Sequence, residues 1–117
     1  MSEKPKILFV DDEQEILDFL VLVFKDCDSA TALSAPSALA LLKRQRFDVL
    51  VTDIKMPGGT GLGLIDEAKR IWPDIPIIVI TGHYQEMPQR AEEKVREWII
   101  KPFGIETIRG AVMNAIR

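Results

Sequence analysis

Short runs of consecutive apolar residues alternate with amphipathic segments along the chain, and this alternation limits the folds that the sequence can adopt. The runs predict five strands, at residues 6–10, 28–33, 48–52, 76–80 and 97–100. Most runs are apolar at successive positions, which is typical of strands buried on both faces of a parallel sheet. The run at 28–33 is more polar, so we expect this strand at a sheet edge.

The segments between these runs predict five helices, at residues 13–25, 34–46, 62–72, 87–95 and 105–116. Apolar residues recur at helical spacing in four of these segments. The exception is 87–95, which contains Pro88, so the fourth helix is expected to be short or irregular. Ser34 and Pro36 suit the cap and the first turn of the second helix. The glycine-rich segment 55–61 is expected to form a flexible loop.

Alternation of strands with helices predicts an α/β fold, in which a five-stranded, doubly wound parallel sheet is covered by helices on both faces. The 117 residues are enough for one domain with a real core, and we expect it to span residues 1–117.

The composition narrows the function classes. The net charge of −3 gives no electrostatic reason to expect direct binding to nucleic acid or to an acidic membrane surface. Cys27 is the only cysteine, which excludes an intrachain disulfide and fits a reducing compartment. The chain start leaves no room for a signal peptide, and no apolar run is long enough to span a bilayer. We therefore expect a cytoplasmic protein.

Polar residues stand where the buried strands end. Asp11 and Asp12 follow the first strand, Asp53 follows the third, Thr81 the fourth and Lys101 the fifth. The carboxyl ends of parallel strands share one edge of the sheet, and doubly wound folds bind ligands at that edge. These side chains are therefore expected to form one site.

The acidic residues allow two interpretations. Asp12 could cap the first helix, with Glu15 completing a capping box. However, two carboxylates about 4 Å apart repel each other by about 4 kcal/mol at an effective dielectric near 20. Asp53 adds a third charge, so a cation is expected among them, and oxygen ligands favour Mg²⁺ or Mn²⁺.

Asp53 could merely end its strand, or it could act as a nucleophile toward a phosphoryl group, since a nearby divalent cation offsets the charge repulsion. Thr81 and Lys101 are weak evidence when each is taken alone. Pro102 is a candidate for a cis peptide bond. The glycines of 59–64 match neither a phosphate-binding P-loop nor a dinucleotide-binding motif.

The constellation resembles the receiver domain of two-component response regulators. The resemblance covers essentially the whole chain and rests on residues 8–13, 53–58, 61–62, 80–82 and 101–103. It implies a flavodoxin-like (βα)5 fold. It also implies that Asp53 accepts a phosphoryl group from a sensor histidine kinase or a phosphotransfer protein, and that the domain then switches conformation for a downstream output.

The resemblance also implies a role for each site residue. Asp12, Asp53 and the backbone carbonyl of Lys55 would bind Mg²⁺ directly, with Asp11 acting largely through water. Lys101 would pair with Asp53 and with the phosphoryl group.

Thr81 would move to bind that group, and Trp98 would be the switch aromatic that follows it. Lys55 and His83 would border the attacking water and tune the lifetime of the phosphorylated state.

The chain departs from the family pattern in three places. Trp98 stands where tyrosine or phenylalanine is usual, and Thr60 where aspartate is frequent. The stretch between Thr81 and Lys101 is slightly short and lacks a small-residue turn before the last strand. This stretch belongs to the usual signalling face, and the face formed by 87–117 could support a homodimer.

Two other functions stay open. One is a receiver-like binding module that works without phosphate, and the irregular fourth helix keeps it under consideration. The other is a Mg²⁺-dependent phosphatase with an aspartyl intermediate, which usually places its two acids two residues apart after the first strand. Asp11, Asp12 and Glu13 fit that spacing badly, so we do not expect an enzyme.

Overall fold

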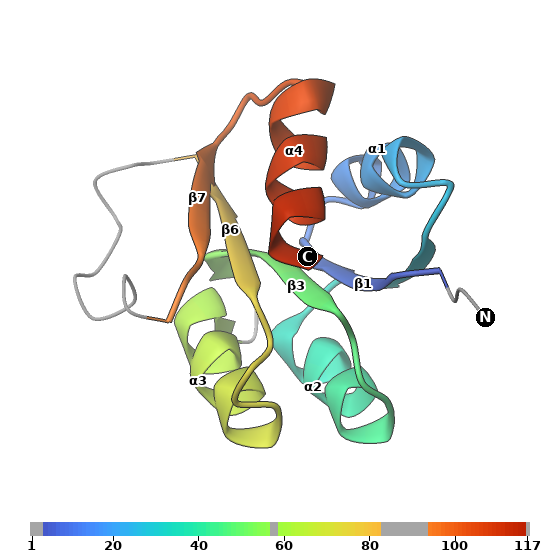
Figure 1. The fold of residues 1–117 in the computed structure, drawn as a ribbon. Coiled ribbons are helices and arrows are strands. Elements are labelled where there is room, and N and C mark those ends of the chain that lie inside the picture. Colours follow the sequence, from blue (N-terminus) through green and yellow to red (C-terminus); the bar gives the residue numbers. More distant parts are fainter. Residues whose placement is uncertain (1–3, 57–58, 83–93, 117) are drawn as a thin grey trace.

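The computed structural model describes residues 4–56, 59–82 and 94–116 of the chain. Its main element is a five-stranded sheet in the order β2-β1-β3-β6-β7 (Figure 1). All neighbouring strands in it are parallel, which confirms the predicted doubly wound α/β fold. The strands are β1 (Lys6–Val10), β2 (Asp28–Ala32), β3 (Val49–Asp53), β6 (Ile77–Thr81) and β7 (Glu97–Ile100).

Helices cover both faces of this sheet (Figure 1). One face carries α1 (Gln14–Val23) and α4 (Ile105–Ile116), and the other carries α2 (Ala35–Arg44) and α3 (Gly61–Ile71). Side chains of successive strand residues enter opposite layers, so Phe9 packs in the α1–α4 layer and Leu8 in the α2–α3 layer. Because both layers are buried, the inner strands are apolar at most positions, and their buried polar residues, Thr52, Asp53 and Thr81, lie near the carboxyl ends.

The predicted fourth helix, 87–95, lies almost wholly outside the described residues. Lys94 and Val95, its last two positions, are not helical. The more polar strand β2 lies at a sheet edge as predicted, and β7 forms the other edge.

The expected loop at 55–61 is instead partly regular. Lys55–Met56 forms a strand, β4, that pairs with Gly59–Thr60, β5, in antiparallel register, and α3 begins directly at Gly61. The register pairs Lys55 with Thr60 and Met56 with Gly59. The prediction of a flexible loop was wrong here because it considered only the glycine content of the segment and not a local pairing of its two ends.

The start of α1 also differs from the capping prediction for Asp12. The N-cap position is Glu13, whose backbone is extended and whose side chain makes no capping hydrogen bond. The Glu13 backbone N–H instead donates to Asp11 Oδ1 at 2.9 Å, so the chain turns around Asp11 and leaves Asp12 exposed. The predicted cap of α2 is confirmed, because Ser34 Oγ accepts the Ser37 N–H at 3.3 Å.

Arg109 ties α4 to the end of α1. Its guanidinium donates to both carboxylate oxygens of Asp26, at 3.0 and 2.6 Å, and to the Val23 carbonyl at 3.0 Å. These hydrogen bonds are the main reason that the pKa of Asp26 falls to about 2. The same guanidinium lies over the Phe24 ring, 5.5 Å from its centroid. This contact fixes the two helices of one layer to each other.

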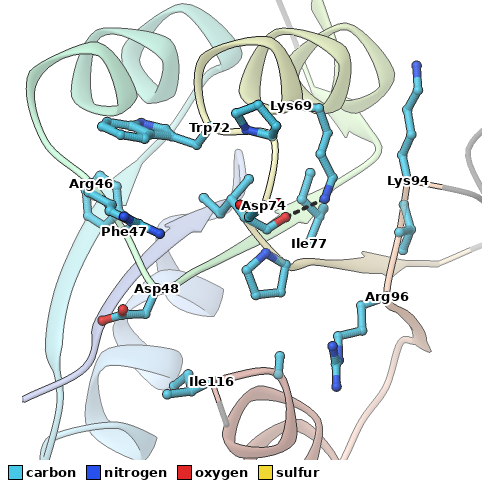
Figure 2. Close-up of a pocket in the computed structure, with 15 residues that line it drawn as sticks. Arg46, Phe47, Asp48, Lys69, Trp72, Asp74, Ile77, Lys94, Arg96 and Ile116 are labelled. Carbon is cyan, nitrogen blue, oxygen red and sulfur yellow. Dashed lines mark hydrogen bonds between the residues drawn. The ribbon is translucent and has the colours of Figure 1, made fainter.

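The two ends of the sheet differ in chemistry. At the carboxyl ends of the strands lie Asp11 and Asp53. At the opposite end, a hollow of about 650 Å³ opens between helix ends and strand starts, near Phe47 and Ile77 (Figure 2). No helix in the described part of the chain is long and apolar enough to cross a membrane.

Candidate functional site

The strand register brings the predicted site residues to one level of the sheet. Val10, the last residue of β1, pairs with Thr52, so Asp11 comes level with Asp53 on β3. Asp53 in turn pairs with Ile80, the residue before Thr81. The sheet order reverses between β1 and β3, which is the point where doubly wound sheets form a crevice beyond their strand ends.

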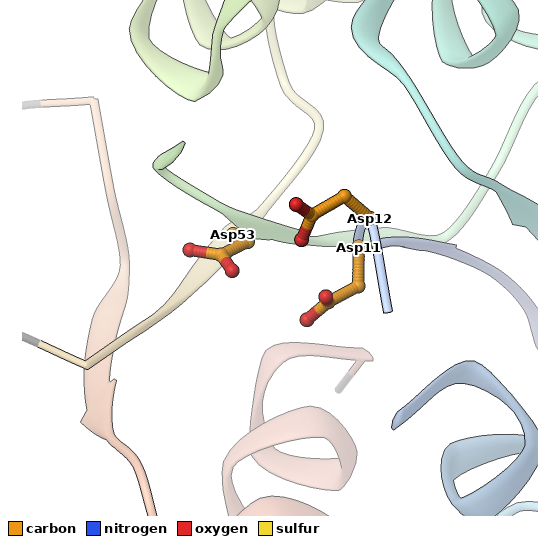
Figure 3. A group of neighbouring side chains, drawn as sticks. All are labelled: Asp11, Asp12 and Asp53. Carbon is orange, nitrogen blue, oxygen red and sulfur yellow. The ribbon is translucent and has the colours of Figure 1, made fainter. Parts of the chain in front are cut away.

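Three carboxylates meet in this crevice (Figure 3). One oxygen from each of Asp11, Asp12 and Asp53 lies within 4.8 Å of the others. Asp11 and Asp53 are buried, whereas Asp12 is exposed at the mouth of the group. The predicted acidic cluster therefore exists, and its charges lie partly out of water, where their repulsion is strong.

Lys101 supplies a positive charge to this group. Its Nζ donates to Asp53 Oδ2 at 3.0 Å and to Asp11 Oδ2 at 3.2 Å. Its backbone N–H donates to the Thr81 carbonyl at 2.8 Å, which fixes the start of its side chain beside β6. The Lys101–Pro102 peptide bond is cis, the isomer for which the sequence made Pro102 a candidate. The contact with Asp11 was not predicted.

Burial and pairing act in opposite directions on these groups. Burial raises the pKa of Asp11, and this outweighs the lowering by the Glu13 N–H and by Lys101. Burial alone would lower the pKa of Lys101, but its hydrogen bond to Asp53 and the charges of Asp11 and Asp53 prevail, so its pKa is raised. Lys101 therefore remains an ammonium ion at neutral pH.

Backbone groups complete the support, and sequence reasoning missed them. The Ile54 N–H donates to Asp53 Oδ1 at 2.7 Å, so each oxygen of that carboxylate has its own donor. Thr52 Oγ1 donates to the Asp53 carbonyl at 2.9 Å. An aspartate at a strand end can accept such a local N–H, but the sequence carries no signal for the Thr52 contact.

The remaining predicted residues are placed as follows. Thr81 ends β6 and is buried, and its neighbour across the sheet is Ile100. Trp98 is half-buried against the α2–α3 layer, and its indole N–H is buried without an acceptor among the described residues. Lys55 begins β4, and His83 lies outside the described residues.

The donor set fits a hard divalent cation. All the candidate ligand atoms are carboxylate oxygens, the type that Mg²⁺, Mn²⁺ and Ca²⁺ prefer. By formal charge, three carboxylates and one ammonium group leave two negative charges, which a divalent ion would neutralise. The exposed position of Asp12 leaves a side open to water, and Mg²⁺ usually keeps several water ligands.

Comparisons with known proteins agree with this geometry. Residues 7–113 match the family model described as response regulator receiver domain. The chain is 36% identical to the hydrogenase transcriptional regulatory protein HoxA of Cupriavidus necator, over 96% of this chain and 25% of that protein. It is 30% identical to the response regulator protein PilR of Pseudomonas aeruginosa, over 97% of this chain and 26% of that protein. The chain thus spans about a quarter of the length of these relatives.

Solved structures show the same fold. A response regulator receiver domain protein from Clostridium thermocellum superposes with a TM-score of 0.88 at 30% identity, covering 96% of this chain and 94% of that one. The response regulator TrrA of Thermotoga maritima, in complex with Mg(2+)-BeF, gives a TM-score of 0.88 at 26% identity, covering 95% and 98%.

The fold, the acidic crevice and the match over residues 7–113 define the class of this protein as an α/β signalling domain. The chain belongs to the response regulator receiver domain family, the phosphoacceptor modules of two-component systems.

Asp11→Asn is expected to stabilise the metal-free protein at pH 7, because the ionised carboxylate is buried at a cost. A raised folded-state pKa means that wild-type stability falls as the pH rises from the unfolded value of 3.8 through the folded pKa. The gain should be on the order of 1 kcal/mol per unit of pKa shift, and it should vanish below about pH 4. Urea denaturation at both pH values measures it.

Asp12→Asn is the matched control, because it removes the same charge from an exposed position. The change in the free energy of unfolding at pH 7 should be smaller for Asp12→Asn than for Asp11→Asn. A loss of stability in Asp11→Asn at pH 7 would show that the Lys101 contact outweighs the burial of Asp11.

Proposed function

We propose that Asp53 is the phosphoacceptor of this receiver domain and takes a phosphoryl group from a phosphohistidine on a sensor histidine kinase or a phosphotransfer protein. The observation that carries this proposal is the environment of the Asp53 carboxylate. Oδ1 is held by a backbone N–H, and Oδ2 faces the Lys101 ammonium at 3.0 Å. The carboxylate is thus held in place beside a cation within the crevice, whose open side at Asp12 is where a phosphoryl group could approach.

The transfer is an in-line displacement at phosphorus. A carboxylate oxygen of Asp53 attacks, a new O–P bond forms, and the P–N bond to the donor imidazole breaks. The departing nitrogen keeps the bonding electron pair and gains a proton from solvent. Lys101 is already within hydrogen-bond distance of the attacking carboxylate, so it can turn to the phosphoryl oxygens without a large movement.

The residues that would hold Mg²⁺ are Asp12, Asp53 and the backbone carbonyl of Lys55, with Asp11 acting through water; Mn²⁺ could replace Mg²⁺. When bound, the ion supplies positive charge that lowers the repulsion between the carboxylate and the incoming phosphoryl oxygens. The oxygen-only donor set and its two uncompensated charges support this assignment.

The proposed switch joins Thr81 to Trp98. The hydroxyl of Thr81 would bind a phosphoryl oxygen, and Trp98 would move with it. Two observations support a mobile Trp98: its side chain is only half-buried, and its indole N–H has no acceptor among the described residues. A buried donor without a partner costs about 1–3 kcal/mol, so a second position for the ring can be of similar free energy.

The partners follow from this chemistry. A histidine kinase or a phosphotransfer protein would supply the phosphoryl group in the cytoplasm. A homodimer would use the face formed by 87–117, whose described part includes the exposed apolar residues Ile100 and Ile105. Residues 1–117 would act as one receiver domain.

Asp53→Asn should abolish phosphorylation. Incubating the wild type with acetyl phosphate and MgCl₂ is expected to add the mass of one phosphoryl group, as read by intact-protein mass spectrometry, and the variant should gain none. Asp48→Asn, at the other end of the sheet, is the control and should be modified like the wild type. Equal modification of the Asp53→Asn protein would refute Asp53 as the acceptor.

Exchanges at Lys55 and His83 should change the lifetime of the phosphorylated state more than its formation, because both residues would border the attacking water. The measurement is the decay of phosphorylated protein after the donor is removed, compared with the initial rate of phosphorylation. We expect a several-fold change in decay with little change in formation. Equal changes in both rates would contradict the assigned role.

A further inference from the structure

The hollow at the amino ends of the strands has no role in the function proposed above. It has a volume of about 650 Å³, within the range of roughly 300–1,000 Å³ typical of small-molecule sites. Its apolar wall is formed by the lining residues Trp72, Pro73 and Pro76. Figure 2 shows Ile116 on the side of α4. The acidic crevice lies at the other edge of the sheet, so a ligand here would not touch it.

Cationic side chains reach this hollow from separate elements. Arg46 follows α2, Lys69 lies on α3 and Arg96 precedes β7. Figure 2 shows Arg46 and Lys69 extending their nitrogens toward the hollow from opposite sides, with Arg96 along its rim beside α4. A fourth cation, Lys94, points away and pairs with Asp66.

These three cations have neutral hydrogen-bond or ring partners. Lys69 Nζ donates to the Ile75 carbonyl at 2.6 Å, and Arg96 donates to the Asn114 carbonyl at 3.4 Å. The Arg46 guanidinium lies over the Trp72 ring, 5.8 Å from its centroid. In the described part of the chain, none of the three forms an ion pair with a carboxylate within 4.0 Å.

The ends of helices explain part of this arrangement. Cations near a helix carboxyl end are stabilised by its dipole, which accounts for Arg96 beside α4 and for Lys69 in the last turn of α3. Arg46 differs from these two, because its guanidinium lies over the ring of Trp72. Burial lowers the pKa of Lys69, which shows that its ammonium lies in a partly dry environment. Charge in such an environment attracts an anion more strongly than charge in water.

We propose that this hollow binds a small ligand carrying a pyrophosphate group, such as a nucleoside diphosphate. Guanidinium groups bind phosphate oxygens through paired N–H donors. Because the cations approach from different sides, a ligand with two linked phosphates can contact more of them than a single anion can. The wall formed by Trp72 and the prolines would take an apolar or planar part of the ligand.

Two carboxylates in the lining repel an anionic ligand and so limit its affinity for the hollow. Neutralising one of them should raise that affinity. Asp48 accepts the Lys6 backbone N–H at 2.8 Å, and Asp74 acts on Lys69 electrostatically. Asp74→Asn should therefore tighten pyrophosphate binding several-fold, because it removes a repelling charge. Arg46→Gln should weaken binding about tenfold, the loss expected for one charge-assisted hydrogen bond.

The two tryptophans make the test specific. Trp72 lines the hollow and Trp98 does not, so the two indole N–H signals in an NMR spectrum report on separate regions. The full chain is titrated in metal-free buffer with sodium pyrophosphate, ADP or adenosine, with NaCl matching the ionic strength. Trp72 should shift and saturate with pyrophosphate and with ADP, and Trp98 should stay in place. Tighter binding of ADP than of pyrophosphate would assign the apolar wall to the nucleoside.

Arg70→Gln is the matched control for Arg46→Gln. Arg70 lies on α3 next to Lys69, but it is outside the hollow and pairs with Glu67. The Arg70→Gln protein should bind pyrophosphate like the wild type. Shifts that do not saturate, or equal weakening in Arg46→Gln and Arg70→Gln, would overturn the proposal and leave these cations as helix-end charges. Tighter binding of a polyglutamate peptide than of either phosphate ligand would also overturn it. None of these results bears on phosphorylation at Asp53.

Discussion

The contact of the Lys101 ammonium with Asp11 and Asp53 is the interaction on which the site depends. The sheet order brings the ends of β1 and β3 together, and the helix layers keep that edge partly dry. Two carboxylates held there without a counter-charge would repel each other by several kcal/mol. Lys101, at the end of the edge strand β7, offsets part of that repulsion and leaves room for a divalent cation at the exposed side of Asp12.

The sequence predicted the sheet and the composition of the crevice because both depend on strong, local signals. A strand segment buried on both faces is apolar at successive positions, so residues 7–10 and 77–80 are easily recognised. Once the strands are parallel, the residues that follow them must meet at one edge. Asp11, Asp12, Asp53, Thr81 and Lys101 could therefore be grouped before any distance was known.

The details that sequence reasoning missed depend on long-range geometry or on the backbone. Asp12 satisfies the pattern of a helix cap, but Asp11 accepts the Glu13 N–H, the backbone donor two residues further along the chain. The pairing of Lys101 with Asp11 joins residues 90 positions apart, and no local pattern encodes it. The same is true of the basic hollow, whose walls come from separate helices and strands and appear only when the chain is folded.

We infer that the three aspartates form one divalent-cation site, for which Lys101 supplies only part of the counter-charge. The most direct test is the thermal unfolding midpoint as a function of MgCl₂ concentration at constant ionic strength. An ion that binds only the folded state stabilises it by about 2.7 kcal/mol at 100 times its Kd. We predict a midpoint that rises with the logarithm of MgCl₂ concentration in the wild type and is flat in Asp12→Asn. An equal rise in both proteins, or none in the wild type, would contradict this account.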